Sequence, residues 1–180
     1  MALEEFILLG DALWLDFVNT ARGRGASPPD RLPDAIAWIL WSSLQQLDAG
    51  GEPGFAPALQ FRARLTELAD ALHDGRAAAS GVIAALNHHL GATSGRQQLT
   101  RVGGDWRLRF APAHPAAALE AIARSAAATL ANTRLAVRRC AAEACSLFFT
   151  DDSPTGSRRW CDAEACGRHS RIERRRGAVR

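Results

Sequence analysis

Four cysteines in two identically spaced pairs constrain this chain more than any other feature. The first pair is Cys140-Ala-Ala-Glu-Ala-Cys145, and after fifteen residues the second is Cys161-Asp-Ala-Glu-Ala-Cys166. Two short-spaced pairs separated by a hairpin-length insert bring four thiolates to one tetrahedral centre, the geometry of closed structural zinc sites. Because the pattern uses every cysteine of the chain, we predict one structural Zn2+ held by Cys140, Cys145, Cys161 and Cys166.

Two disulfide bonds, or unconnected buried thiols, are the alternatives to a metal site. Disulfides persist in oxidising compartments, and the first residues, Met1-Ala-Leu-Glu-Glu, are acidic where a secretory leader needs positive charge. We therefore expect a cytoplasmic protein whose thiols bind metal. No apolar run approaches the roughly 18 to 20 residues of a membrane helix, so we expect no membrane partner.

Charge is divided unevenly between the two ends of the chain. Residues 134–180 carry eleven arginines and six acidic residues, a net charge of +5, whereas residues 1–133 carry eleven arginines and thirteen acidic residues, a net charge of −2. The length of 180 residues suits one ordinary domain with a small appended module, and we place the boundary between these two parts. A basic terminal module favours a polyanionic partner, and we expect DNA.

Residues 1–133 are expected to form a mainly helical domain with one β-hairpin. Asp11 and Asp34 are expected to cap the first two helices, the second of which should turn its isoleucines and leucines inward. Alternating residues on both sides of Gly103-Gly104 predict the hairpin. Apolar residues recur at helical offsets in the stretches 6–21, 34–44, 57–73, 79–90 and 115–131, and the inward residues of the second are Ile36, Ile39, Leu40 and Leu44.

Asp16 and Asn19 are candidates for lining a pocket, because they lie three residues apart and share a face of the first helix. The alternative is that they hydrogen-bond to the following loop, as buried polar groups usually find a partner. Residues 1–133 contain no Gly-rich phosphate loop, no Gly-x-Ser-x-Gly elbow and no free cysteine nucleophile. We therefore expect no enzymatic activity.

Residues 134–180 are expected to form a treble-clef-like zinc finger. With the helical N-terminal domain and its hairpin, the predicted fold class of the whole chain is mainly α, of the α+β type. The pattern predicts a strand over 134–139 and a hairpin between 147–150 and 157–160. Asp162 is expected to cap a helix that runs through Cys166 to about Arg176. About 45 residues bury too little apolar surface to fold alone, so metal binding worth on the order of 10–16 kcal/mol is expected to hold them together.

Several short stretches of the chain match the motifs of a known family. They are Leu147-Phe-Phe-Thr-Asp-Asp-Ser, Gly156-Ser-Arg-Arg-Trp-Cys161, Leu15-Asp-Phe-Val-Asn-Thr20, Ala37-Trp38, Arg62 and Leu86-Asn87. With them the sequence resembles the bacterial CGNR zinc-finger family together with the ABATE domain that precedes this finger. The resemblance implies a stress-induced transcription regulator with a DNA-binding finger and an N-terminal domain that binds a small ligand, for which Asp16, Asn19 and Arg62 are the candidate residues. The family motif Cys-Gly-Asn-Arg is Cys166-Gly-Arg-His here, so contacts made by its Asn and Arg would be redistributed.

Seven arginines of the zinc module are candidate DNA contacts, because guanidinium groups bind phosphates and guanine edges in a bidentate manner. They are Arg158, Arg159, Arg168, Arg171, Arg174, Arg175 and Arg176. Three alternatives stay open: a solvated basic tail, a protein-interaction or purely structural module, and an N-terminal enzyme acting on a small stress-related compound.

The assembly and location follow from the DNA-binding hypothesis. One finger reads too few bases for a genome, so a two-fold DNA site would require a homodimer. The alanine-rich helix of 115–131 is a candidate interface, with packing inside the chain as the alternative. A DNA-binding protein of this kind is expected in the bacterial cytoplasm, associated with the nucleoid.

Overall fold

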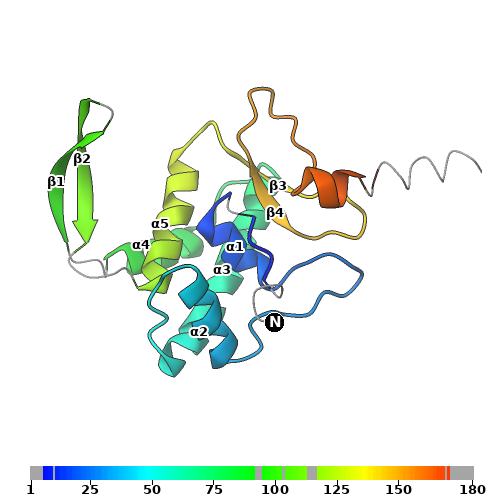
Figure 1. The fold of residues 1–180 in the computed structure, drawn as a ribbon, viewed down its shortest axis with the longest axis horizontal. Coiled ribbons are helices and arrows are strands. Elements are labelled where there is room, and N and C mark those ends of the chain that lie inside the picture. Colours follow the sequence, from blue (N-terminus) through cyan, green and yellow to red (C-terminus); the bar gives the residue numbers. More distant parts are fainter. Residues whose placement is uncertain are drawn as a thin grey trace, which may run out of the picture.

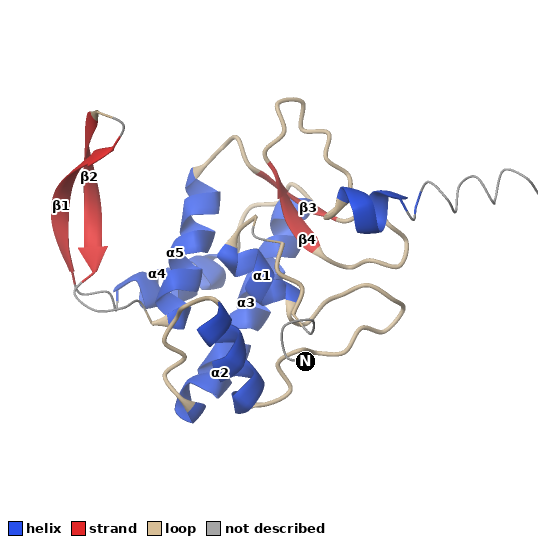
Figure 2. Ribbon diagram, in the orientation of Figure 1, coloured by secondary structure: helices blue, strands red, loops and turns tan. Residues whose placement is uncertain are grey.

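The computed structural model describes residues 6–9, 11–91, 95–102, 104–112, 117–168 and 170. Within these residues, helices form the body, a two-stranded ribbon projects from one side, and a second, shorter pair of strands leads to the cysteines (Figures 1 and 2). In chain order the elements are α1 (Leu13–Asn19), α2 (Ala35–Leu44), the 3-10 turn η1 (Glu52–Gly54), α3 (Phe55–His73), α4 (Ser80–Gly91), β1 (Gly95–Val102), β2 (Asp105–Pro112), α5 (Ala118–Ala131), β3 (Ala136–Arg139), β4 (Phe148–Asp151) and the π-helical turn η2 (Ala163–Gly167).

Helix α1 lies at the centre of the body, against α3, α5 and β4 (Figure 1). Trp14 and Phe17 of α1 are fully buried. The indole N–H of Trp14 donates a hydrogen bond of 3.0 Å to Thr129 on α5. Phe17 packs against the stacked indoles of Trp38 and Trp41 on α2, with ring centroids 5.6 and 5.3 Å away. The apolar face predicted for the first helix thus forms the centre of the core.

Helix α2 turns only part of the predicted face inward: Leu40 and Leu44 pack against the core, but the isoleucines do not. Asp34 caps it as expected, accepting a hydrogen bond of 2.8 Å from a backbone N–H of the first turn. However, Ile36 and Ile39 are 78% and 39% exposed, whereas Trp38 and Trp41 are fully buried. The inward orientation predicted for the two isoleucines was wrong, because burying two indoles removes more apolar surface from water and so decides how the helix rotates.

The other helices of the body follow the predicted periodicity. Leu65 and Leu68 of α3 are fully buried, as are Ile122 and Ala126 of α5. Helix α5 lies against α1 and α4, so its apolar stripe, a candidate dimer interface in the sequence, is covered within the chain. None of the described helices combines the length and the apolar character needed to cross a membrane.

Strands β1 and β2 form the antiparallel ribbon predicted around Gly103-Gly104. Their register pairs Val102 with Asp105 beside the turn and Gly95 with Pro112 at the base. Gly104 has a φ of 93°, a conformation that favours glycine in a tight turn. Gly103 lies outside the described residues.

Strand β4 has a different partner from the predicted one. It pairs antiparallel with β3, matching Val137 with Thr150 and Arg139 with Phe148, and residues 157–160 form no strand. The hairpin predicted between 147–150 and 157–160 was therefore wrong. Val137 and Phe148 belong to the same buried cluster as the helices of the body, so this pair of strands is part of the main core.

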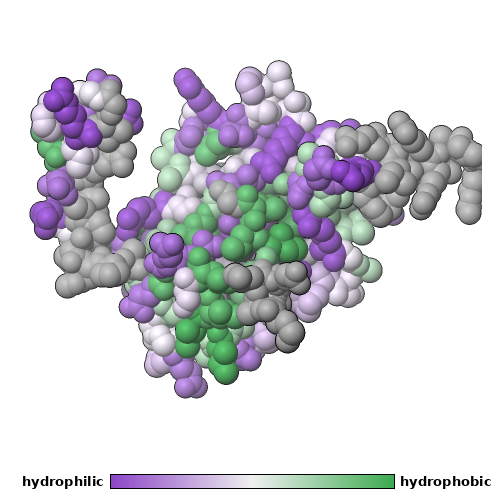
Figure 3. Space-filling model, viewed as in Figure 1, coloured by the Kyte–Doolittle hydropathy of each residue, from purple (hydrophilic) through white to green (hydrophobic). Residues whose placement is uncertain are grey.

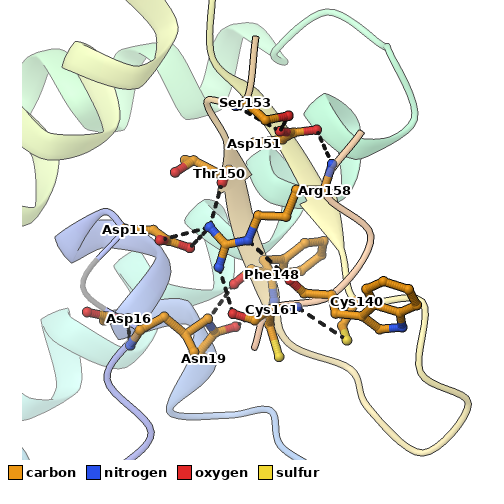
Figure 4. Close-up of polar contacts among 12 residues, drawn as sticks. Asp11, Asp16, Asn19, Cys140, Phe148, Thr150, Asp151, Ser153, Arg158 and Cys161 are labelled. Atoms are coloured by element: carbon orange, nitrogen blue, oxygen red, sulfur yellow. Dashed lines mark hydrogen bonds and ion pairs between the residues drawn. The ribbon is translucent and has the colours of Figure 1, made fainter. Parts of the chain in front are cut away.

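Side chains occupy the edge of β4 where a third strand would have paired (Figure 4). The side-chain amide of Asn19 donates to the Phe148 carbonyl and accepts from the Phe148 N–H, both at 2.9 Å. Arg158 donates to the Thr150 carbonyl at 3.1 Å. Because Phe148 and Thr150 are buried, their outward backbone groups need such partners, and these two side chains supply them.

Asp11 contributes to this edge instead of capping α1. The N-cap of α1 is Ala12, which makes no side-chain capping bond. The Asp11 carboxylate pairs with Arg158 at 3.0 Å, as Figure 4 shows. The predicted cap was wrong, because the half-buried guanidinium of Arg158 is a stronger partner for a carboxylate than the backbone N–H groups of a seven-residue helix.

Asn19→Ala is expected to lower the free energy of unfolding of the zinc-loaded protein by about 2 kcal/mol or more, because two buried backbone groups of Phe148 lose their partners. Asn87→Ala is the matched control. Asn87 is exposed on α4, so its loss should change stability by less than about 0.5 kcal/mol. Urea unfolding followed by circular dichroism measures both, and equal effects of the two substitutions would contradict the role given to Asn19.

Candidate metal centre

The first cysteine pair lies in the turn that connects β3 to β4. Cys140 directly follows β3, and its N–H donates to the Leu147 carbonyl at 2.9 Å, which extends the ladder by one bond. The Cys145 N–H donates to the Ala142 carbonyl at 3.0 Å and closes a tight turn. These bonds direct both thiols to the same side of the loop.

The second pair is held by η2. As predicted, Asp162 is the N-cap: its Oδ1 accepts hydrogen bonds of 2.8 Å from the N–H groups of Glu164 and Ala165. Cys161 lies just before this cap, and Cys166 lies within the turn. The Ala141 N–H donates to the Arg159 carbonyl at 2.9 Å and joins the second half of the site to the first.

The four sulfur atoms converge in a single cluster. They all lie within 4.8 Å of one another, with 3.8 Å between Cys145 and Cys161 and 3.6 Å between Cys161 and Cys166. Tetrahedral coordination with Zn–S bonds of about 2.3 Å requires sulfur–sulfur distances of roughly 3.8 Å, whereas a disulfide requires about 2.05 Å. All four cysteines are free. They form a site for one zinc ion, and the disulfide alternative is wrong.

Burial and thiol chemistry suit this ion. All four cysteines are buried, and Leu147, Phe149 and Trp160 pack around them. Neighbouring thiols of the cluster hydrogen-bond to one another and so differ in acidity. The hydrogen bond from Cys145, followed by that from Cys161, lowers the pKa of Cys140. Zinc binds the thiolate form, so a cluster that already favours one thiolate is suited to loading the ion.

The loop that follows α1 packs directly on the zinc centre. Arg24 forms a β-bridge with Cys145, and the Gly25 N–H donates to the Ala144 carbonyl at 2.6 Å. The Arg24 guanidinium lies 3.9 Å from the Cys161 sulfur and 3.7 Å from the Asp162 carboxylate. Although burial works to lower it, hydrogen bonds to the thiolates raise the pKa of Arg24. Four thiolates around Zn2+ leave a net negative charge, which this guanidinium partly balances.

Arg158, one of the candidate DNA contacts, makes several bonds within the chain. Besides Asp11 and Thr150, its guanidinium donates to the carbonyls of Cys161 at 2.6 Å and Trp160 at 3.1 Å, and it lies over the Phe149 ring. Figure 4 shows it between α1, β4 and the cysteines. Arg158 therefore links the zinc centre to the helical core.

The other candidate DNA contacts fall into two groups. Arg159 is exposed and stacks over Trp160 with 5.5 Å to the ring centroid. Arg168 is exposed and pairs with Glu164 one helical turn away. The remaining candidates lie outside the described residues, and their contacts stay a prediction; they are Arg171, Arg174, Arg175 and Arg176.

The candidate ligand residues make bonds within the chain. Asp16 accepts a hydrogen bond of 2.8 Å from the Leu9 N–H, and Asn19 holds β4. Arg62 pairs with Asp30 through two hydrogen bonds of 2.8 and 2.5 Å. A hollow of about 510 Å³ between the loop and α2 includes Asp30 in its lining, but none of the three candidates. Ligand binding by Asp16, Asn19 and Arg62 stays a prediction.

The sequence did not reveal Arg24 and Arg158 as partners of Cys161, or Asp11 as the partner of Arg158. Two of these contacts join residues that are distant in sequence: Asp11 lies 147 residues from Arg158, and Arg24 lies 137 residues from Cys161. The only signal was that Arg24 stands between two glycines in a loop. Such spacing indicates a close backbone approach without naming the partner.

Zinc is expected to bind with a stoichiometry of one ion per chain, measured by native mass spectrometry, and to be released by acid because thiolates must be deprotonated to bind it. After chelation, amide hydrogen exchange should accelerate over residues 152–168. Strand β4 should stay protected, since Phe148 is anchored in the helical core. Equal loss of protection in β4 would show that the strand depends on the metal.

Arg24→Gln is expected to weaken zinc affinity by roughly tenfold to a hundredfold, the usual effect of removing a group that supports metal ligands. Arg64→Gln, which removes an exposed arginine paired with Glu67, is the control and should leave the affinity unchanged. Competition with a chromogenic chelator measures both. Unchanged affinity in the Arg24 variant would mean that the loop contributes nothing to the ion.

Comparison with known families agrees with this geometry. The ABATE family, described as "Putative stress-induced transcription regulator", matches residues 11–133, and the CGNR zinc finger matches residues 136–177. A comparison with curated proteins gave no match. The first match covers more than half of the chain and the second includes all four cysteines. The chain therefore belongs to the ABATE family and ends in a CGNR zinc finger.

Proposed function

We propose that the protein is a zinc-dependent, DNA-binding transcription regulator whose N-terminal domain senses a small ligand. The observation that carries the proposal is the attachment of an arginine-rich end to a four-cysteine centre fixed on the helical core. Residues 134–180 have a net charge of +5, and in the sequence η2 comes directly before their most basic stretch. The proposal assigns the protein no enzymatic activity and places it with DNA in the cytoplasm.

The charges around η2 support contact with a polyanion. Arg159 forms no ion pair with any described residue. The pair between Arg168 and Glu164 is exposed, with 66% and 74% of the two side chains accessible to solvent. Exposed ion pairs of this kind contribute about 0–1 kcal/mol to stability. Arg168 can therefore leave the Glu164 carboxylate and bind a phosphate with little loss of stability.

The loop of residues 22–33 supports the sensing part of the proposal. Near its end, Asp30 is held by Arg62, and Arg31 donates its N–H to the Thr20 carbonyl at 2.8 Å. At its beginning, Arg24 touches the zinc ligands. An anionic ligand that competes with Asp30 for Arg62 would release one end of a loop whose other end contacts the metal centre, and so would couple ligand binding to the finger.

DNA binding is tested with the zinc-loaded full chain by fluorescence anisotropy, using a labelled duplex at several salt concentrations. We expect the variant R171Q/R174Q/R175Q to reduce the slope of log K against log salt by about 2.7, or about 0.9 for each phosphate that is no longer neutralised. The control R64Q/R76Q/R124Q removes the same charge from exposed, ion-paired arginines and should reduce it by less than about 1. Salt-independent or absent DNA binding would contradict the proposal and favour a protein-interaction module.

A further inference from the structure

The ribbon β1–β2 carries arginines that are free of carboxylate partners. Its two strands contain four arginines and one aspartate. Among the described residues, Arg96, Arg101 and Arg107 are exposed and form no ion pair, although ten arginines elsewhere in the described chain do. The ribbon is thus a place where this chain exposes positive charge without balancing it.

One face of the ribbon carries only polar residues among those whose side chains are described: Arg96, Gln98, Thr100, Asp105 and Arg107. Side chains alternate between the faces along a strand, so Arg96, Gln98 and Thr100 of β1 share a face with Arg107, which is the partner of Thr100 in β2. Arg96, Gln98 and Arg107 are exposed. Hydrophilic side chains cover much of the described ribbon surface visible in Figure 3. Arginine and glutamine are the residue types that bind guanine and adenine edges in pairs of hydrogen bonds.

The opposite face of the ribbon has a different character. Leu99 and Trp106 lie there and are 57% and 64% exposed, and the Arg101 guanidinium lies 5.8 Å from the Trp106 ring. An isolated two-stranded hairpin is marginally stable in water, so a bound partner would stabilise this ribbon. Its excess of positive charge favours a polyanion over a second, equally basic copy of the ribbon.

The dimensions of the ribbon suit duplex DNA. The two strands of a ribbon lie about 4.8 Å apart. The major groove is about 12 Å wide and admits such a ribbon together with its side chains. The ribbon and η2 lie on opposite sides of the helical body (Figure 1). A globule of this length is on the order of 40 Å across and the ribbon projects beyond the body (Figure 1), so contacts at the ribbon and at η2 would lie more than one DNA turn of roughly 34–36 Å apart.

We infer that the ribbon β1–β2 is a second DNA-contacting element, which places its polar face in the major groove more than one turn from the zinc finger. The inference rests on the proposed function only in taking DNA as the partner. The residues of the ribbon belong to the N-terminal domain and not to the zinc finger. It gives the protein a longer footprint than one finger has, without requiring a dimer.

The test is anisotropy with the zinc-loaded full chain and a labelled duplex of about 30 base pairs, or three turns. R96Q/R107Q is expected to reduce the salt slope by about 1.8 and the affinity at 0.1 M salt by roughly tenfold to a hundredfold. R64Q/R76Q removes two charges from exposed ion pairs and should change the affinity less than about threefold. Trp106→Ser, on the opposite face, should also change it less than about threefold.

The outcomes separate this inference from the proposed function. If R171Q/R174Q/R175Q weakens binding and R96Q/R107Q matches its control, the inference about the ribbon is overturned and DNA contact by the zinc finger is supported. If only R96Q/R107Q weakens binding, DNA contact by the ribbon is supported and DNA contact by the finger is contradicted. Tighter binding to a single strand that is lost in Trp106→Ser would overturn duplex recognition. A dimer seen by light scattering that R96Q/R107Q or Trp106→Ser dissociates would instead make the ribbon a contact between copies.

Discussion

The backbone of β4 has to find hydrogen-bond partners on an edge where no strand pairs with it. An unsatisfied buried carbonyl or N–H costs about 1–3 kcal/mol, so a buried strand with one neighbour needs other donors and acceptors. Asn19 supplies both for Phe148, and Arg158 supplies a donor for Thr150. Each of these side chains comes from a different segment, one from α1 and one from the loop before Cys161. The edge of β4 therefore joins the helical core to the zinc centre.

The zinc finger of this protein is consequently not an independent module. Its first strands lie in the hydrophobic core of the N-terminal domain, and its ligand turns contact a loop of that domain. Arg139, at the end of β3, also pairs with Asp70 on α3. The cysteine cluster and the hydrophobic core therefore lie in adjacent parts of one structure. The loop of residues 22–33 contacts the metal ligands directly, through Arg24 and Gly25.

Arginine serves two purposes in this lysine-free chain. Some guanidiniums are structural: Arg62, Arg138 and Arg158 hold carboxylates and carbonyls within the described residues. These use the fixed fork of donors that arginine presents and lysine lacks. Others, on the ribbon and near η2, are exposed and available to a partner. Sequence charge alone assigned Arg158 and Arg159 to the same surface, although one is enclosed and the other faces solvent.

The sequence by itself determined the zinc ligands, the cap at Asp162, the helices of the body and the ribbon, because each depends on spacing or periodicity within a short stretch. Tertiary structure decided the features that depend on competition between distant residues. The indoles of α2 displaced its isoleucines from the core because they bury more surface. Strand β4 took β3 as its partner because Asn19 and Arg158 occupy its other edge. Arg24 contacts Cys161 although 137 positions separate them in the sequence. The two residues come together only when the body folds, so no local sequence pattern predicts the contact.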